Sequence, residues 1–353
     1  MPGGVKIAAI VCIAVMTSVV YFLSFSVADE IPARLPIVLD HLPVKEREPT
    51  LSCERYGLRP FANGTAPAEE ALPRLYEFFT FTNEDDILHI HLHEMSPVVD
   101  YFVIVEAAVT FTGRRRSLVW PTIRDQPRFQ PYLSRIVYTN LSSLPGQTPW
   151  DKEHFIRNAN VRAVLTQPPP IRPRAGDLAV LVDCDEIPRA ELLRHVKRCD
   201  PGSWTSPAAL RMVMFYYNFR TLAPVVWDWA KVFQLTPRML KHGMRTFQRR
   251  AKPVYRFPNA GWHCSYCFRN VSFLVSKIES FSHVEFNKEE YKNRTRILDS
   301  VKTGVDLFGR AKFTLLRGDT RDLDAPSCIQ VPARCYSTAL YLSDVEEFIR
   351  INT

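Results

Sequence analysis

The segment GDLAVLVDCDEIP, residues 176–188, is the most informative part of this sequence. A glycine and an acid lead into five consecutive apolar residues, 178–182, and the run ends in three carboxylates and a proline. A continuous apolar run of this length predicts a strand buried on both faces, as in a parallel sheet. Open α/β sheets bind ligands at the carboxyl ends of their strands. We therefore expect an α/β fold with a binding site at residues 183–186.

Asp183 and Asp185 are two residues apart at the end of this run, so both carboxylates can reach one divalent cation. Oxygen ligands suit Mg²⁺ or Mn²⁺, which complete their coordination with water and substrate phosphates. The pattern predicts a site for a metal-diphosphate complex. The alternative is a structural turn that caps the next helix. Asp-x-Asp also arises by chance, as residues 322–324 illustrate without a preceding apolar strand.

The composition narrows the class of protein and of partner. With 46% hydrophobic and 23% charged residues, the 353-residue chain has room for one large globular domain or two small ones. Its net charge of +8 suits an anionic partner such as a phosphorylated substrate. The basic residues are scattered rather than gathered into one stripe, apart from 114–116 and 249–250, and this argues against nucleic-acid binding.

The N-terminal region predicts that the protein is anchored in a membrane. Residues 5–27 are almost wholly apolar and long enough to span a bilayer as a helix. The flanking charges favour an uncleaved type II anchor with the body in the lumen, and a cleaved signal peptide is the alternative. Residues 29–73 are rich in proline and charge, as in a stem. We expect a cytosolic tail and anchor over 1–28, a stem over 29–73 and a lumenal catalytic domain over 74–353.

The cysteines and glycosylation sequons agree with a lumenal body. Three disulfides of open pairing are predicted among Cys53, Cys199, Cys264, Cys267, Cys328 and Cys335. We interpret Cys184 as a small buried side chain. The Cys-x-x-Cys at 264–267 is more typical here of structural disulfides than of redox chemistry or zinc binding. Sequons begin at Asn63, Asn140, Asn270 and Asn293.

The remaining elements follow from periodicity and turn residues. Strands are predicted at 75–81, 101–106 and 210–219, and helices after 83–86 and over 150–165 and 191–199. The strand-helix-strand unit from 75 to 106 favours a parallel sheet. Glu106 ends its strand, where it could touch the ligand. Trp227, Trp229 and Phe233 form an aromatic stretch that suits either sugar stacking or core packing.

Residues 87–95 contain His89, His91 and His93. A strand would place all three on one face, as in a zinc cluster, whereas a helix would align only His89 and His93. The apolar residues between them favour a helix packed on a sheet. We expect the histidines on its solvated face.

Several spaced motifs together resemble the family 17 glycosyltransferases over residues 76–310. They are FFTFTNEDDILHIHLHE (78–94), VVDYFVIVEAAVTFTG (98–113), Arg157-Asn158, GDLAVLVDCDEIP, GWHCSYCF (261–268), FSHVEFN (281–287) and GVDLFGR (304–310). Familiar animal members read DDADEIP where this chain has VDCDEIP, and the outer acids of Asp-x-Asp are kept. The resemblance implies a type II Golgi membrane protein with a GT-A-like, Rossmann-type mixed sheet for nucleotide-sugar binding, flanked by helices, after an N-terminal transmembrane helix.

The resemblance also implies a reaction and its participants. The donor is UDP-GlcNAc, the acceptor is the β-mannose of a glycoprotein N-glycan core, and the β-1,4 bond forms with inversion, assisted by Mn²⁺ or Mg²⁺. Asp183 and Asp185 take the place of the metal and diphosphate acids. His263 matches the motif histidine, a metal ligand or phosphate contact. Arg157 and Asn158 lie on a helix that faces the nucleotide. From its own position at a strand end, rather than from the resemblance, Glu106 is also expected among the donor-binding residues.

An inverting transfer needs a base that takes the proton of the acceptor hydroxyl. Glu285 is the first candidate, with Glu186 and Asp228 as others, and Asp185 completes the expected catalytic set. Two alternatives remain open at this stage. One is a glycosyltransferase of another donor or acceptor specificity, and the other is an inactive, membrane-tethered carbohydrate-binding protein.

Overall fold

The computed structural model describes residues 53–54, 58–61, 68, 71–200, 207–242, 253, 255–310, 315–318, 323–330 and 341–353. The chain divides into two units, Met1–Thr50 and Leu51–Thr353, and every described residue belongs to the second. The expected membrane anchor and most of the expected stem lie outside the described residues. Within the described residues, no helix has the length and hydropathy needed to cross a bilayer. The domain boundaries at residues 28 and 73 stay predictions.

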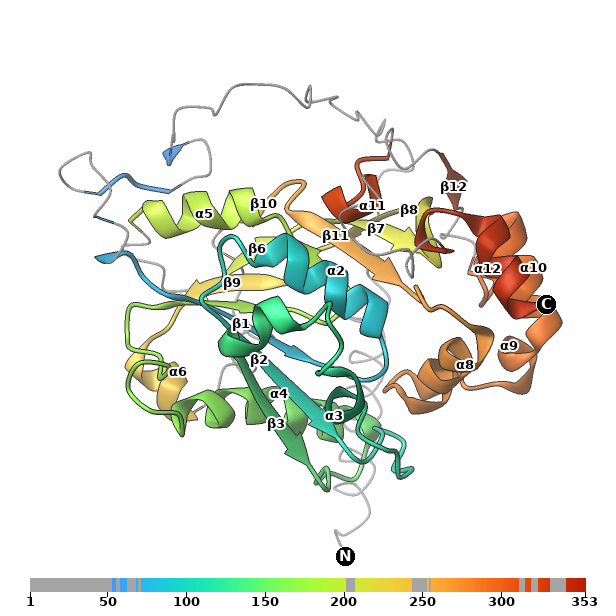
Figure 1. Cartoon of the computed structure of the whole chain (residues 1–353), viewed down its shortest axis with the longest axis horizontal. Helices are drawn as coiled ribbons and strands as arrows, with labels where there is room; N and C mark the ends of the chain where they lie inside the picture. The colour runs from blue at the N-terminus through green and yellow to red at the C-terminus, as the bar shows by residue number, and fades with distance from the viewer. Residues whose placement is uncertain are drawn as a thin grey trace, which may run out of the picture. The chain divides into compact units, whose positions relative to one another are not determined.

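A mixed sheet forms the first layer of this unit (Figure 1). Its seven strands lie in the order β10 (Arg256–Phe257), β6 (Ala208–Leu210), β9 (Lys231–Gln234), β4 (Leu178–Leu181), β1 (Leu75–Thr80), β2 (Tyr101–Ala107) and β3 (Ile136–Leu141). Strands β4, β1, β2 and β3 are parallel, whereas β9 is antiparallel to both of its neighbours. The expected parallel strands and the burial of the 178–182 run are confirmed.

After β4, the chain enters a second sheet. Its five strands lie in the order β12 (Leu316–Arg317), β8 (Asn218–Trp227), β7 (Met212–Tyr216), β11 (Gly261–Ser265) and β5 (Glu186–Pro188). Since β4 belongs to the first sheet and β5 to the second, the chain passes between the sheets through residues 182–185. The predicted acids therefore lie at the junction of two sheets.

Helices cover both faces of the parallel strands. The helices of the described residues are α2 (Asp85–Met95), α3 (Trp120–Ile123), η3 (Gln130–Arg135), α4 (Pro149–Leu165), α5 (Ala190–Arg198), α6 (Pro237–His242), α8 (Val271–Ser280), η4 (Val284–Phe286), α9 (Glu289–Lys292), α10 (Arg294–Thr303), α11 (Ser327–Gln330) and α12 (Val345–Asn352). Successive side chains of a strand point to opposite faces. Phe79 therefore joins the core cluster of Leu88 in α2, while Phe78 joins that of Val161 in α4.

A separate core cluster lies beside the second sheet. Helices α8, α10 and α12 gather there (Figure 1) and contribute Leu274, Ile297 and Phe348. Each buried side chain of this size stabilises the fold by roughly 1.5–3 kcal/mol relative to exposure. Helix α10 is closed at both ends, because Asn293 accepts from the amide of Arg296 and a left-handed Gly304 ends the helix.

Two sequence predictions need correction. The expected single strand over 210–219 is a hairpin, because Tyr217 has φ 69° between β7 and β8 and the carboxamide of Asn218 accepts from the amide of Arg220. The expected helix over 87–95 is confirmed, but His89 and His91 are buried rather than solvated. The strands cover one side of α2, and aromatic residues of the 120–135 region cover the other.

The other elements agree with the sequence to within a few residues. The strands at 75–81 and 101–106 and the helices at 150–165 and 191–199 are all confirmed. Disulfides join Cys53 to Cys199 and Cys264 to Cys267, and Cys328 is also disulfide-bonded. Cys335 lies outside the described residues. Cys184 is free and buried, as expected.

Candidate active site

The acid loop, residues 183–186, is a tight turn whose backbone is held by hydrogen bonds within the turn and from the second sheet. The amide of Glu186 donates to the carbonyl of Asp183 at 2.9 Å, as in a β-turn. The amide of Cys264 in β11 donates to the carbonyl of Asp185 at 2.9 Å. The loop therefore presents its carboxylates from a rigid backbone rather than from a long, mobile connection.

Asp183 is held by Arg157 of α4. The guanidinium contacts both carboxylate oxygens, and its Nη2 donates to Oδ2 at 2.8 Å. Its Nε donates to Glu153 one helical turn away, at 3.1 Å. Burial lowers the pKa of Arg157, but the charges of Asp183 and Glu153 outweigh it and raise the pKa above its ordinary value. Arg157 is therefore a fixed positive charge against the loop, on the helix where the sequence places it.

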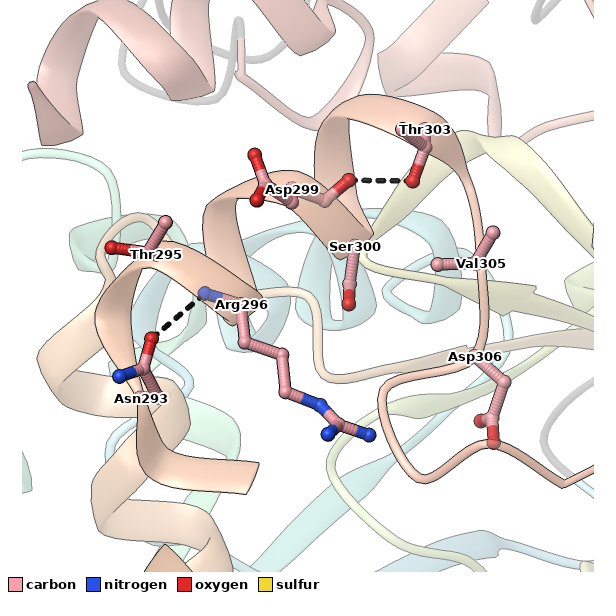
Figure 2. Close-up of a pocket in the computed structure, with 8 residues that line it drawn as sticks. All are labelled: Asn293, Thr295, Arg296, Asp299, Ser300, Thr303, Val305 and Asp306. Atoms are coloured by element: carbon pink, nitrogen blue, oxygen red, sulfur yellow. Dashed lines mark hydrogen bonds between the residues drawn. The ribbon is translucent and has the colours of Figure 1, made fainter. Parts of the chain in front are cut away.

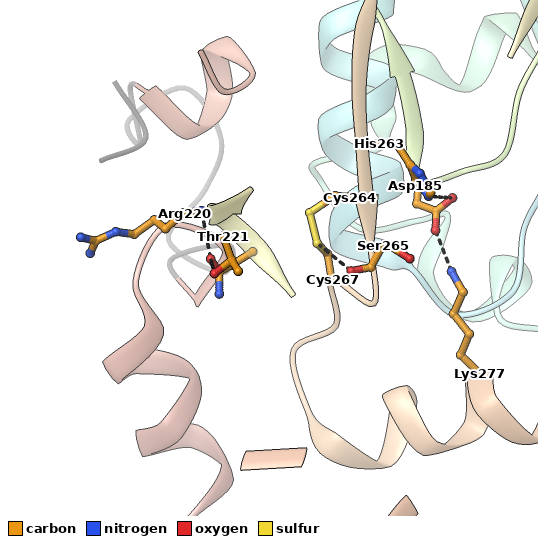
Figure 3. Close-up of a disulfide and its surroundings, with 9 residues drawn as sticks. Asp185, Arg220, Thr221, His263, Cys264, Ser265, Cys267 and Lys277 are labelled. Carbon is orange, nitrogen blue, oxygen red and sulfur yellow. Dashed lines mark hydrogen bonds and ion pairs between the residues drawn. A yellow bond between two sulfur atoms is a disulfide. The ribbon is translucent and has the colours of Figure 1, made fainter. Parts of the chain in front are cut away.

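Asp185 lies between a lysine and a histidine (Figure 3). Its Oδ2 accepts from Nζ of Lys277 in α8 at 2.6 Å, and its Oδ1 lies 3.7 Å from Nε2 of His263 in β11. Lys277 also lies 3.8 Å from the carboxylate of Glu84, at the start of α2. Burial raises the pKa of Asp185, yet Lys277 and His263 outweigh it and hold the pKa well below its usual range.

Glu186 is the most buried of the three acids, at 2% exposure. One carboxylate oxygen accepts from the amide of Asp183 at 2.9 Å, and the other accepts from the indole of Trp227. The Trp227 ring also lies 4.3 Å from the ring of His263. Burial and the charge of Asp183 raise the pKa of Glu186 to about 7. Because both oxygens are engaged within the protein, Glu186 is placed to hold the loop in shape.

The other predicted residues lie in different surroundings. Glu285, in η4, is 57% exposed at its side chain and lies 2.7 Å from Nδ1 of His283. Asp228 lies 3.4 Å from Nε of Arg256. Asn158 is half-buried on α4, next to Arg157. Their catalytic and donor-binding roles stay predictions.

Glu106 is fully buried and well satisfied at the end of β2. It accepts from the amides of Val119 and Trp120 at 2.6 and 3.1 Å, and from the hydroxyl of Tyr138 at 3.0 Å. Arg116 completes the set at 2.7 Å. These contacts give the Glu106 carboxylate a structural role, because they anchor the loop that precedes α3. Its expected donor-binding role stays a prediction.

Comparison with known proteins assigns the chain to a family. Residues 5–313 match the model of glycosyltransferase family 17. The chain belongs to glycosyltransferase family 17. It is therefore a glycosyltransferase, and the resemblance predicted from its motifs is confirmed.

The similar curated proteins share one name and one level of identity. The β-1,4-mannosyl-glycoprotein 4-β-N-acetylglucosaminyltransferases of Rattus norvegicus, Homo sapiens and Mus musculus are each 24% identical to this chain over 261 residues. Each alignment covers 65% of this chain and 48% of the relative. The chain therefore spans about half the length of the curated relatives it matches.

Two solved structures give only distant alignments. A 4-diphosphocytidyl-2C-methyl-D-erythritol synthase aligns over 53% of this chain and 90% of its own, with 12% identity and a TM-score of 0.34. A mycobacterial protein aligns over 49% and 46%, with 15% identity and a TM-score of 0.24. At TM-scores below 0.5, neither structure bears on the fold of this family 17 enzyme.

The donor atoms of the acid loop suit a divalent cation, but their present contacts are with protein cations. In the described part of the chain, no group of three or more His, Cys, Asp or Glu side chains is arranged to hold a metal ion. Asp183 and Asp185 offer carboxylate oxygens, which Mn²⁺ and Mg²⁺ prefer. The buried Nδ1 of His263 has no hydrogen-bond partner among the described residues. The chemistry of the two carboxylates suits a cation, and a cation that binds here would compete for them with Arg157 and Lys277.

Sequence reasoning missed Lys277, Glu84 and Trp227 as neighbours of the acid loop. Lys277 is 92 residues from its partner Asp185, and an isolated lysine in a helix carries no signal of that contact. The histidines of α2 were noticed in the sequence, but they were interpreted as a solvated helix face. Nδ1 of His91 lies 2.9 Å from the carbonyl of Cys184, so this side chain supports the acid loop from behind.

A separate cavity lies beside α10 (Figure 2). Its volume is about 470 Å³, and it is lined by Asn293, Thr295, Arg296, Asp299, Ser300, Thr303, Val305 and Asp306. None of the predicted site residues lines it. The cavity is therefore separate from the acid loop and from the other predicted site residues.

Proposed function

We propose that this enzyme moves GlcNAc from UDP-GlcNAc to the β-mannose of a glycoprotein N-glycan core, forming a β-1,4 bond with inversion. The name shared by its three curated relatives supports GlcNAc as the transferred sugar, a β-1,4-mannosyl-glycoprotein as the acceptor and a 4-β linkage. The observation that carries the proposal is the acid loop, where Asp183 and Asp185 follow a buried parallel strand and face two basic side chains. A mixed sheet flanked by helices, with acids at the end of β4, supports a GT-A-like fold.

The proposed roles follow from the positions of the side chains. Asp183 and Asp185, with His263 beside them, would hold Mn²⁺ or Mg²⁺, which when bound offsets the negative charge on the leaving diphosphate. Arg157 supplies a planar, bidentate contact suited to a phosphate. Glu186 fixes the loop through the amide of Asp183 and the indole of Trp227.

Glu285 is the proposed base. Its carboxylate is exposed, so an acceptor hydroxyl can reach it, and His283 orients it at 2.7 Å. The same segment is tied to the site, because the hydroxyl of Ser282 donates to Glu153, which in turn holds Arg157. In this arrangement Glu285 accepts the proton of the acceptor hydroxyl as that oxygen attacks the anomeric carbon.

We further propose that the enzyme is a single-pass type II protein of the Golgi membrane, with residues 1–28 as tail and anchor, 29–73 as stem and 74–353 as lumenal catalytic domain. The long apolar run over 5–27 supports the anchor. The disulfides at Cys53–Cys199 and Cys264–Cys267 support an oxidising compartment. Accessibility of the body to protease in intact microsomes tests the orientation, since a cytosolic body would be digested.

Transfer with defined substrates tests the reaction. The purified enzyme is incubated with Mn²⁺, a panel of UDP-sugars and a defined biantennary N-glycan, and the products are read by mass and linkage analysis. A GlcNAc added β-1,4 to the core mannose is the expected product. Transfer of another sugar, or to another position, would favour the second candidate, a family 17 enzyme of different specificity. The 24% identity and half-length coverage of the relatives keep that candidate open.

A further inference from the structure

Both acids of the Asp-x-Asp pair are engaged by basic side chains from separate helices. Lys277 of α8 donates to Asp185 at 2.6 Å, and Arg157 of α4 donates to Asp183 at 2.8 Å. Each carboxylate is thus neutralised by one cation of the chain. A metal ion that uses these carboxylates competes with both cations for them, and a cation that gives up its carboxylate is stabilised by a new anionic partner.

We propose that Lys277, together with Arg157, binds the diphosphate of the nucleotide-sugar donor, and that Lys277 exchanges Asp185 for a phosphate oxygen when a divalent cation occupies the acid loop. This inference rests on the proposed function. It assigns Lys277 a direct contact with the donor and makes the lysine a competitor of the metal for Asp185.

The surroundings of Lys277 suit a cation that changes partner. Its side chain is 21% exposed, so an incoming ligand can reach the ammonium group. Nζ lies 3.8 Å from the carboxylate of Glu84, and 5.7 and 5.5 Å from the rings of Tyr266 and Phe268. A second anion and two aromatic rings near Nζ stabilise its positive charge. Lys277 therefore has other favourable neighbours when it leaves Asp185.

Charge balance explains why the exchange needs both ligands. A divalent cation alone would leave Lys277 and Arg157 with only Glu84 and Glu153 as anionic neighbours, and the excess positive charge in a partly buried site is unfavourable. A diphosphate alone would face the unshielded carboxylates of Asp183 and Asp185. The cation and the diphosphate together carry nearly opposite charges, so they keep the site close to neutral. Binding of Mn²⁺ and of the nucleotide is therefore mutually reinforcing.

Binding measurements on the full chain test the exchange without relying on turnover. Calorimetry with Mn²⁺ alone, UDP alone and both together is performed on the wild type, Lys277→Met and Lys277→Arg. In Lys277→Met we expect UDP with Mn²⁺ to bind about 10- to 100-fold more weakly, the effect of one charge-assisted hydrogen bond. Mn²⁺ alone should bind several-fold more tightly, because its competitor for Asp185 is gone. Lys277→Arg should keep UDP binding within roughly threefold of the wild type.

Two further variants separate this role from a structural one. Lys292→Met removes a lysine from neighbouring α9, where Nζ pairs with Glu279 at 3.4 Å, and should leave both affinities unchanged. Asp185→Asn frees Lys277 and should strengthen UDP binding in the absence of metal, and adding Lys277→Met should abolish that gain. This pair keeps the test valid if Lys277→Met alone does not fold.

The outcomes distinguish the inference from the proposed function. If the wild type binds UDP with Mn²⁺ and Lys277→Met binds both ligands as the wild type does, Lys277 is only a structural partner of Asp185 and the inference is wrong. Weaker UDP binding with unchanged Mn²⁺ affinity would overturn the exchange. If the folded wild type binds no UDP with or without Mn²⁺, the proposed function itself fails, and this inference fails with it.

Discussion

His91 and Glu77 form a fully buried ion pair directly behind the acid loop. Nε2 of His91 lies 3.1 Å from Oε1 of Glu77, and neither side chain is exposed. The other ring nitrogen of His91 donates to the carbonyl of Cys184, between the two acids of Asp-x-Asp. Burial lowers the pKa of His91, but the charge of Glu77 outweighs it and raises the pKa above the ordinary value. A protonated ring can donate in both directions, so the pair connects β1 and α2 to the acid loop.

Replacing His91 by Gln should destabilise the protein strongly. The substitution leaves the buried Glu77 carboxylate without its cation, and breaking a buried pair in this way costs about 3–5 kcal/mol. Urea unfolding measures the loss. His93→Gln, a half-buried histidine on the same helix, is the matched control and should change stability by less than about 1 kcal/mol. Equal stability of His91→Gln and the wild type would show that the pair does not support the loop.

The sheet and the acid loop were predictable because their signals are local. The apolar run at 178–182 needs no long-range information to indicate a buried strand, and the βαβ pattern before it indicates parallel pairing. The membership in a family followed from several spaced motifs in order, a far more specific signal than any single one. These predictions agree with the structure and with the family match.

The contacts between distant segments were not predictable. Lys277 meets Asp185 only because α8 packs beside the junction of the two sheets, 92 residues further along the chain. The histidines of α2 illustrate the same limit. Their spacing predicts a helix correctly, but whether a polar face meets water depends on what covers it, and here Phe129 and Tyr132 approach His89. A pattern of polar residues therefore predicts periodicity better than exposure.

Stability should fall as the pH drops through the range in which His89 gains a proton. Burial, then the charges of Arg128 and His93, lower the pKa of His89 from 6.5 to about 4. Between these values the unfolded chain binds a proton that the folded protein excludes, so stability rises with pH across this window and is lost as the pH falls. The contribution is about 3 kcal/mol at most. His89→Gln should flatten the pH dependence of the free energy of urea unfolding between pH 4 and 6.5. If the variant keeps the pH dependence of the wild type, groups other than His89 cause it.

Glu285→Gln should lower kcat by about 10²- to 10⁴-fold with little change in the KM for the donor, because the proposed base is removed while the acid loop is untouched. Glu289→Gln is the control, since Glu289 is 92% exposed on the neighbouring α9 and should be silent. Initial rates with a defined N-glycan acceptor measure both variants. Full activity of Glu285→Gln would redirect the search for the base to Glu186 and Asp228.

Asp185→Asn should lower transfer about a thousandfold, because loss of several kcal/mol of leaving-group stabilisation corresponds to a factor of that size. Treating the wild type with EDTA should produce a similar loss that Mn²⁺ restores, whereas EDTA should have little further effect on the variant. Asp299→Asn, on the exposed face of α10, should retain full activity. Circular dichroism verifies that each variant is folded. Normal turnover by Asp185→Asn would refute metal binding at the acid loop, because that role requires the carboxylate.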